Sequence, residues 1–185
     1  MASLSNSATI LLEAVFNQKG AQVFGSWFQD AVAYALGTMD AYQGCYMNRG
    51  AGQPDIISGR TGFEVKSIAD GTVTLDGNYR LIRSQYDYFK LVGLRTDVKP
   101  FPLWVLEMPL NPPESVTFHR TMDSRTPVDE ELNRELASRL SMVLVAAGTS
   151  WTEAPDRDAG CIALRRAAES ELLIRGIVRL RMPLC

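Results

Sequence analysis

The chain has 185 residues, 46% of them hydrophobic and 22% charged, with a formal net charge of −2. This is typical of one globular domain with a sizeable core, and it excludes an overall basic field for nucleic acid, although a local basic face would suffice. No apolar run reaches the roughly 18–20 residues that span a bilayer. The N-terminus lacks the features of a signal peptide, and three scattered cysteines with one histidine argue against a zinc site. We expect a cytoplasmic protein with no membrane association.

The first half of the chain alternates helical and extended patterns. The pattern predicts, in chain order, helices at 8–17 and 21–36 that break at Gly20, a short strand near 45–47 in a turn-rich segment, a hairpin at 52–68 and a strand at 72–75.

The second half begins with a predicted helix at 81–93, because Ile82, Tyr86, Phe89 and Val92 recur at helical spacing. Further along, the pattern predicts strands at 101–108 and 115–119, a helix from about Pro127 to Gly148, a polar loop at 149–160, and a tail at 161–182 that is either a helix or a helix followed by a strand. This order predicts an α/β fold with a central mixed β-sheet flanked by helices.

The hairpin places two carboxylates opposite each other. Gly59 and Arg60 form a two-residue loop with glycine first, as a type II′ turn requires. The resulting register pairs Asp55 with Glu64, and strand alternation puts Lys66 on the same face. Like charges directly opposite destabilise a sheet, so this arrangement predicts a cation between the carboxylates.

Magnesium suits such a site. Mg²⁺ prefers oxygen ligands and takes one or two carboxylates, so Asp55, Glu64 and the Val65 carbonyl are the predicted ligands, with Mn²⁺ as a possible substitute. Lys66 would orient a water molecule and offset phosphate charge, which indicates phosphodiester hydrolysis. The alternative is an exposed hairpin in which Glu64 and Lys66 only solvate one face, but that alternative must still explain the facing carboxylates.

Pro54-Asp55, eight intervening residues and Glu64-Val65-Lys66 together resemble the signature of the PD-(D/E)XK nucleases. This superfamily includes restriction endonucleases, junction resolvases and repair nucleases, and its core is a helix, a β-meander, a helix and a further strand. The resemblance implies a restriction-endonuclease-like catalytic core at about 21–108 within a single domain, 1–185. It also implies that Asp55 and Glu64 bind the metal and that Lys66 assists the attacking water.

The resemblance points to auxiliary residues as well. Gln29 stands near the place where resolvases carry a glutamate after Gly-Ser, and Asp30 and Glu13 are the other candidates for a third metal-directed group. Gln85 resembles a glutamine that several branches direct towards the site, so it is a candidate catalytic contact. Each of the four could instead be an ordinary polar residue on a helix surface.

Arginines supply the candidate DNA contacts. Arg80 and Arg83 flank the proposed site, and Arg175, Arg179 and Arg181 would share one face if the tail forms a strand. Such a row could meet successive phosphates, although a solvated charged face is an equal alternative. Residues 109–185 would supply sequence recognition and dimerisation.

The sequence therefore predicts a Mg²⁺-dependent endonuclease that cuts double-stranded DNA. A type II restriction enzyme is favoured, because a chain of this size would cut both strands of a palindrome as a two-fold homodimer. The alternatives are a structure-specific nuclease such as a Holliday junction resolvase, and a non-catalytic DNA-binding or assembly protein that retains the fold.

Overall fold

The structure is a computed structural model that describes residues 2–48, 52–69, 72–75, 85–112, 115–117 and 127–174. Its elements are β1 (Ala2–Ser3), α1 (Asn6–Lys19), α2 (Ala21–Gly37), the 3-10 helix η1 (Asp40–Tyr42), β2 (Tyr46–Met47), β3 (Ile56–Ser58), β4 (Thr61–Ile68), β5 (Thr72–Thr74), β6 (Tyr88–Arg95), β7 (Pro102–Met108), β8 (Ser115–Thr117), α4 (Glu130–Thr152) and α5 (Arg157–Ile174).

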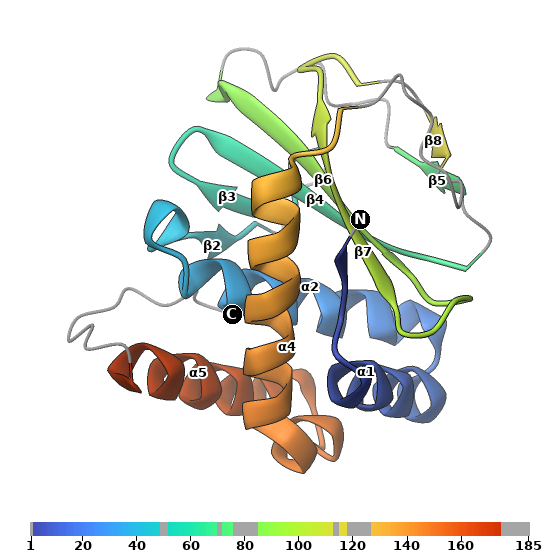
Figure 1. The fold of residues 1–185 in the computed structure, drawn as a ribbon, viewed down its shortest axis with the longest axis vertical. Coiled ribbons are helices and arrows are strands. Elements are labelled where there is room, and N and C mark those ends of the chain that lie inside the picture. The colour runs from blue at the N-terminus through green and yellow to red at the C-terminus, as the bar shows by residue number, and fades with distance from the viewer. Residues whose placement is uncertain are drawn as a thin grey trace.

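Within these described ranges the strands form a mixed sheet of six, in the order β1-β7-β6-β4-β3-β2, and a separate pair, β5-β8 (Figure 1). Strands β2, β3 and β4 make an antiparallel meander, β4 runs parallel to β6, and β7 is antiparallel to β6 and β1. The α/β architecture with a central mixed sheet is therefore confirmed. The structure also contains a short strand that the sequence pattern did not predict, β1, which pairs with the edge of β7.

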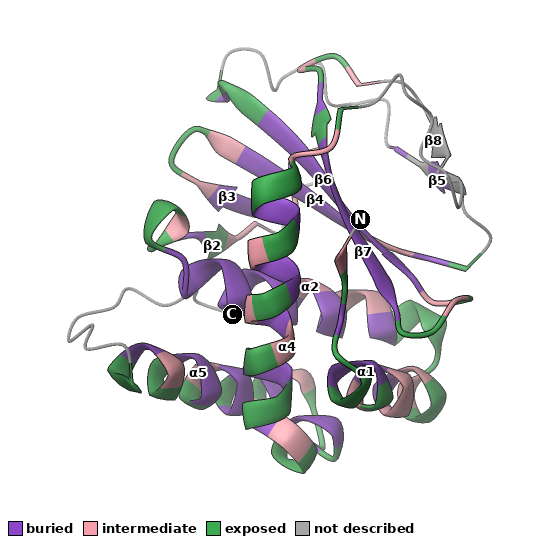
Figure 2. Ribbon diagram, in the orientation of Figure 1, coloured by how far each residue is buried: buried purple, intermediate pink, exposed green. Residues whose placement is uncertain are grey.

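Both faces of the central strands are buried (Figure 2). One face packs against the helices, and its core includes Phe63 and Val65 of β4 together with the buried side of α2. The other face carries a second cluster in which Phe89 and Leu91 of β6 pack near Val73 of β5. A strand in the middle of this sheet therefore has no exposed side on which polar residues would alternate.

Helix α2 lies at the centre of the helical layer. Gly20, with φ of +80°, ends α1 and begins α2 at the predicted break, a conformation that glycine adopts at little cost. From Asp30 to Gly37 every residue of α2 is buried. Helices α1, α4 and α5 all contact α2, so this helix organises the core on that face. Among the described helices, none is both long and apolar enough to cross a membrane.

Helix α4 is fixed to the sheet by its N-terminal cap. The Asp129 carboxylate accepts a hydrogen bond from Leu132 N at 3.1 Å and another from Lys90 Nζ of β6 at 2.7 Å. Because the Lys90 side chain is 9% exposed, this charge is partly desolvated and the pairing orients the helix relative to β6.

The predicted helix at 81–93 is wrong from residue 86 onward, because residues 86 and 87 are not helical and the chain forms β6 from residue 88. Gln85 is helical, and residues 81–84 lie outside the described part of the chain. The apolar spacing was misleading because Phe89 and Leu91 face one core cluster while Val92 and Leu94 face the other. A strand buried on both sides shows a continuous apolar run, which periodicity alone cannot distinguish from a helix.

The predicted polar loop at 149–160 is also wrong over most of its length. Helix α4 bends at Gly148, where φ is +52° and ψ is −137°, but then continues to Thr152, and α5 begins at Arg157. The extra turn forms because Trp151 is fully buried and packs against Trp27, with ring centroids 5.9 Å apart. The predicted tail is helical to Ile174, and residues 175–185 are outside the described range.

A buried ion pair joins α2 to α5. The Arg157 guanidinium donates two hydrogen bonds to Asp30, at 2.6 and 2.7 Å, and the Asp30 side chain is 3% exposed. Ion pairs of this kind contribute little over an apolar pair, but losing one partner is costly because a charge remains buried. The geometry thus assigns Asp30 to the helix–helix contact.

Replacing Arg157 with alanine should lower the free energy of unfolding by about 2–3 kcal/mol, less than for a fully buried pair because the arginine is partly exposed. The double variant Asp30→Asn/Arg157→Ala should recover part of the loss. Arg60→Ala is the control, since Arg60 and Asp87 form an exposed bidentate pair whose removal should change stability little. Urea denaturation measures all three, and an equal loss in the Arg157 and Arg60 variants would contradict the assignment.

Candidate functional site

The predicted hairpin is present with three of its four predicted residue pairs, and the fourth, Asp55 with Glu64, is not part of the ladder between β3 and β4. Ser58 faces Thr61, Ile57 faces Gly62 and Ile56 faces Phe63. In the loop, Gly59 has φ of +56°, while none of the described non-glycine residues, Arg60 included, has a positive φ. A type I′ turn needs positive φ at both central positions, so the turn is of type II′, as the glycine-first loop predicted.

Pro54 sits directly on the hairpin and places the residue that follows it. A Cβ atom at position 62 would lie 2.5 Å from Pro54 Cγ, closer than real side chains approach. Glycine is therefore required at this point of β4 so that the proline ring can approach the strand. A hydrogen bond from the Tyr86 hydroxyl to Gln53 Oε1, at 3.1 Å, holds the preceding residue. These contacts fix where Asp55 enters the sheet.

The Asp55 side chain accepts a hydrogen bond from the backbone of β4 in place of a neighbouring strand. Its backbone carbonyl accepts from Asn48 N at 2.8 Å, and its carboxylate accepts from Val65 N, also at 2.8 Å. The carboxylate thus stands beside β4 where the ladder from β3 stops. A residue in a strand directs its N–H and C=O to the same side, so the Val65 carbonyl faces the Asp55 side of β4.

Glu64 is buried, and only one of its two carboxylate oxygens has a partner among the described residues. Its side chain is 3% exposed, one oxygen, Oε1, forms an ion pair with Lys66 Nζ, and the other oxygen, Oε2, has no hydrogen-bond partner among the described residues. A buried carboxylate oxygen without a partner is costly. A cation bound between the two carboxylates would give this oxygen a partner.

The surroundings of Asp55 raise the pKa of its carboxyl. Burial, and after it the neighbouring Glu64 carboxylate, raise the pKa of the Asp55 carboxyl to about 6. The hydrogen bond from Val65 N–H, the Lys66 ammonium and a hydrogen bond from Gln29 act in the opposite direction. The repulsion expected from two facing carboxylates is therefore present in the structure, and Gln29 of α2 reaches the site.

The residues present fit a hard divalent cation. Two carboxylates, one with an unpartnered oxygen, and a backbone carbonyl offer oxygen ligands of the kind that Mg²⁺ binds, with water and phosphate completing its shell. No cluster of three or more His, Cys, Asp or Glu side chains able to hold a metal was found in the described part of the chain. Besides the two carboxylates, a metal here would take its ligands from the backbone carbonyl, water and phosphate, which is common for Mg²⁺.

The other candidate residues divide into two groups. Gln29 is brought to Asp55, as described above, whereas Asp30 is engaged with Arg157 and Glu13 forms an ion pair with Lys99 at 2.5 Å. Gln85 is exposed and precedes Tyr86, which is buried. Only Gln29, among these four, has an interaction with the Asp55 carboxylate in the structure.

The five candidate DNA-binding arginines, Arg80, Arg83, Arg175, Arg179 and Arg181, lie outside the described residues. One arginine near the hairpin was not singled out from the sequence. Arg60, in the turn, donates to both oxygens of Asp87 at 2.7 and 2.9 Å, and its carbonyl accepts from Asp87 N and Tyr88 N. This clamp ties the hairpin tip to the start of β6. A long-range pair of this kind has no signal in sequence spacing.

Comparisons of the chain with family models, with curated proteins and with solved structures found no match. The ground for a functional proposal is therefore the geometry of the hairpin and its residues.

Replacing Gly62 with alanine should displace Pro54 and with it Asp55, at a cost of about 1–3 kcal/mol in the free energy of unfolding, because the new methyl group overpacks the contact. Gly25→Ala is the matched control: a Cβ there meets nothing within 4 Å and lies in a helix, so this variant should be stabilised by up to about 1 kcal/mol. Thermal or urea unfolding compares the two, and a neutral Gly62→Ala variant would contradict the close approach.

Replacing Asp55 with asparagine tests the charge repulsion directly. Because the folded-state pKa of Asp55 is raised from 3.8 to about 6, the ionised carboxylate opposes folding above about pH 6 and this cost disappears below about pH 4. Without metal, the variant should thus be more stable than wild type by about 1–3 kcal/mol at about pH 7.5 and equal to it at about pH 4.

Magnesium should reverse the difference. A ligand that binds the native state stabilises it, so adding MgCl₂ should raise the unfolding temperature of the wild type and leave Asp55→Asn unchanged, and EDTA should cancel the gain. Differential scanning fluorimetry at both pH values measures this. An equal response of both proteins to Mg²⁺ would contradict a metal site at Asp55.

Proposed function

We propose that the protein is a Mg²⁺-dependent DNA endonuclease of the restriction-endonuclease-like class. The observation that carries the proposal is the meeting of Asp55, Glu64 and Lys66 on the hairpin, where Glu64 is buried with one oxygen unpartnered. Carboxylates held together against their repulsion, beside a lysine, are suited to binding a cation and a phosphodiester. The spacing of these residues is the one that resembles the PD-(D/E)XK signature.

The order of elements supports the same class. Helix α2 precedes the β2-β3-β4 meander that carries the three residues, and β6 then joins β4 in parallel. The first helix and the meander correspond to those expected from the resemblance, whereas the expected second helix at 81–93 is replaced by β6 from residue 88 and its residues 81–84 lie outside the described part of the chain. The support from the fold is therefore limited to the helix and the meander that carry the three residues.

Each residue has a distinct part in the proposed chemistry. Asp55, Glu64 and the Val65 carbonyl would hold Mg²⁺, which supplies a Lewis acid for charge that develops on the phosphate. Gln29 would keep the Asp55 carboxylate oriented through its hydrogen bond. Lys66, whose side chain is one-third exposed, would orient the attacking water and offset the phosphate charge. A bond from the water oxygen to phosphorus would then form while the bond to the leaving sugar oxygen breaks; the attacking water gives up a proton to solvent, and the leaving oxygen takes up one from solvent.

Within this class we favour a type II restriction enzyme that acts on double-stranded DNA as a homodimer in the cytoplasm. Two copies related by a two-fold axis would bring two hairpins to the two strands of a palindromic site. The net charge of −2 is a weaker match to a junction resolvase, which depends on extensive contacts to the DNA backbone.

Cleavage of a plasmid of known sequence in the presence of Mg²⁺ tests the proposal. The wild type should give discrete fragments, while Asp55→Asn, Glu64→Gln and Lys66→Ala should each lower the rate by at least about a hundredfold, as expected when a positioned charge in a catalytic site is lost. Glu135→Gln is the control, because this carboxylate of α4 pairs with Arg139 and should leave the rate unchanged.

The pattern of products separates the related functions. Nicking or smearing that the three variants abolish would favour a structure-specific or nonspecific nuclease, and a four-way junction is then the substrate to compare with linear duplex. Equal cutting by wild type and variants would overturn the assignment of the hairpin. Mg²⁺-independent binding of DNA, with no cleavage of any of these substrates, would favour the non-catalytic alternative.

A further inference from the structure

Exposed apolar side chains gather on two helices. In the part of the chain that the structure describes, nine large hydrophobic residues are exposed, and five of them lie on α4 and α5: Met142, Val145, Ile162, Leu173 and Ile174. Single exposed apolar residues are ordinary on a protein surface, but a group on adjacent elements indicates an interaction site. Helices α4 and α5 contact each other and cross, with α4 vertical and α5 horizontal in the view of Figure 1.

Helix α5 carries a regular stripe on its outer side. Ile162, Arg166, Glu169 and Leu173 are all exposed, and their spacing of four, three and four residues places them in one line along the helix. The opposite side of α5, which includes Leu164, Ala168 and Leu172, is buried. The stripe therefore faces away from the core of its own chain.

The stripe is complementary to itself when reversed. It reads apolar, basic, acidic, apolar, so a second copy running antiparallel presents apolar, acidic, basic, apolar. With the two-fold axis between Ala167 and Ala168, Arg166 of each copy faces Glu169 of the other, and Ile162 of each faces Leu173 of the other. A two-fold interface requires a patch that matches itself in this way.

A groove beside the stripe can receive the facing side chain. It lies between α4 and α5, has a volume of about 490 Å³ and is lined largely by small residues. On α5 its lining includes Ala159, Ile162, Ala163 and Arg166, which have the spacing of a four-residue hole for one knob from a facing helix. The antiparallel arrangement centred at 167–168 brings Leu173 of the second copy to this hole.

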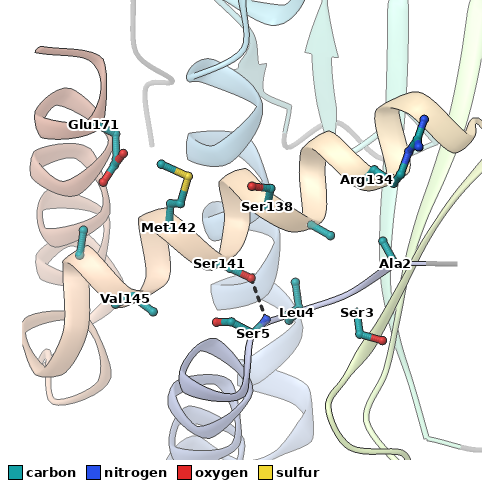
Figure 3. A pocket seen from close by; sticks show the side chains of 12 residues that line it. Ala2, Ser3, Leu4, Ser5, Arg134, Ser138, Ser141, Met142, Val145 and Glu171 are labelled. Carbon is teal, nitrogen blue, oxygen red and sulfur yellow. Dashed lines mark hydrogen bonds between the residues drawn. The ribbon is translucent and has the colours of Figure 1, made fainter. Parts of the chain in front are cut away.

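A second groove extends the apolar surface across α4. It has a volume of about 680 Å³ and lies between β1, α4 and the end of α5, with Met142 and Val145 on its α4 side (Figure 3). Ala146 lines both grooves, so the two adjoin. A stable interface buries about 800 Å² on each partner, more than one helical stripe provides, and this adjoining surface supplies further apolar area.

We propose that the outer face of α5, with the adjoining α4 grooves, is a homodimer interface in which a second copy of the chain packs α5 against α5 in antiparallel orientation. The inference rests on the homodimer of the proposed function and names its interface, but it involves none of the hairpin residues and would hold equally for a non-catalytic protein. Charge complementarity selects a second copy as the occupant, since the same two opposite charges face each other twice across the axis.

Charge reversal on the full chain tests the interface. By sedimentation equilibrium the wild type should be a dimer, and the single variants R166E and E169R should each raise the dimer dissociation constant by at least about tenfold, because like charges then face each other. K99E, a reversal at an exposed ion pair elsewhere, should leave the constant unchanged. Circular dichroism verifies that every variant is folded.

Mixing the two single variants provides the decisive measurement. Arg166 and Glu169 are three residues apart and could also pair within one helix, and the double variant R166E/E169R would restore either contact. An equimolar mixture of R166E and E169R restores only the contact between copies, so it should form a heterodimer with wild-type affinity. A monomeric wild type, single variants that remain dimeric, or a mixture that stays monomeric would each overturn the proposal. A monomeric wild type that still cuts plasmid DNA would overturn this interface and the homodimer while leaving the assignment of the hairpin as a nuclease site in place.

Discussion

The candidate site depends on the hydrogen bond from Val65 N–H to the Asp55 carboxylate. Where β3 stops, this carboxylate takes the place of a backbone partner and stays beside β4, next to Glu64. Pro54, packed on Gly62, sets the approach, and Gln29 holds the other side. Without that bond, the two carboxylates would be free to move apart and the cost of their repulsion would be relieved. The geometry therefore keeps a charge arrangement that folding alone would avoid.

The cost of this arrangement is met by the rigid surroundings of the hairpin. Strand β4 lies between β3 and β6, with a core cluster on each face, so its side chains cannot change face without disrupting both clusters. The Arg60–Asp87 clamp holds the tip of the hairpin and the Tyr86–Gln53 bond holds its base. A site that must present two close carboxylates to a cation benefits from such support, because binding then requires little reorganisation.

The two proposals rest on different kinds of side chain. The site is made of buried charges that lack full compensation, whereas the proposed interface is made of exposed apolar side chains and opposite charges that match in pairs. Asp30 connects the two regions: it neighbours Gln29 in α2 and pairs with Arg157 at the start of α5. Helix α2 consequently holds the hairpin residue Asp55 through one side chain and the helix of the proposed interface through the next.

The sequence by itself determined the local features of this protein. The glycine-first loop specified the turn, and strand alternation then fixed that Glu64 and Lys66 share a face, because both follow from backbone geometry over a few residues. Only the tertiary structure decided that 88–95 is a strand, that Trp151 draws another helical turn into the core, and that Gln29 rather than Asp30 reaches Asp55. These outcomes depend on which surfaces cover a segment, and burial on both faces of β6 removed the periodicity on which prediction relies.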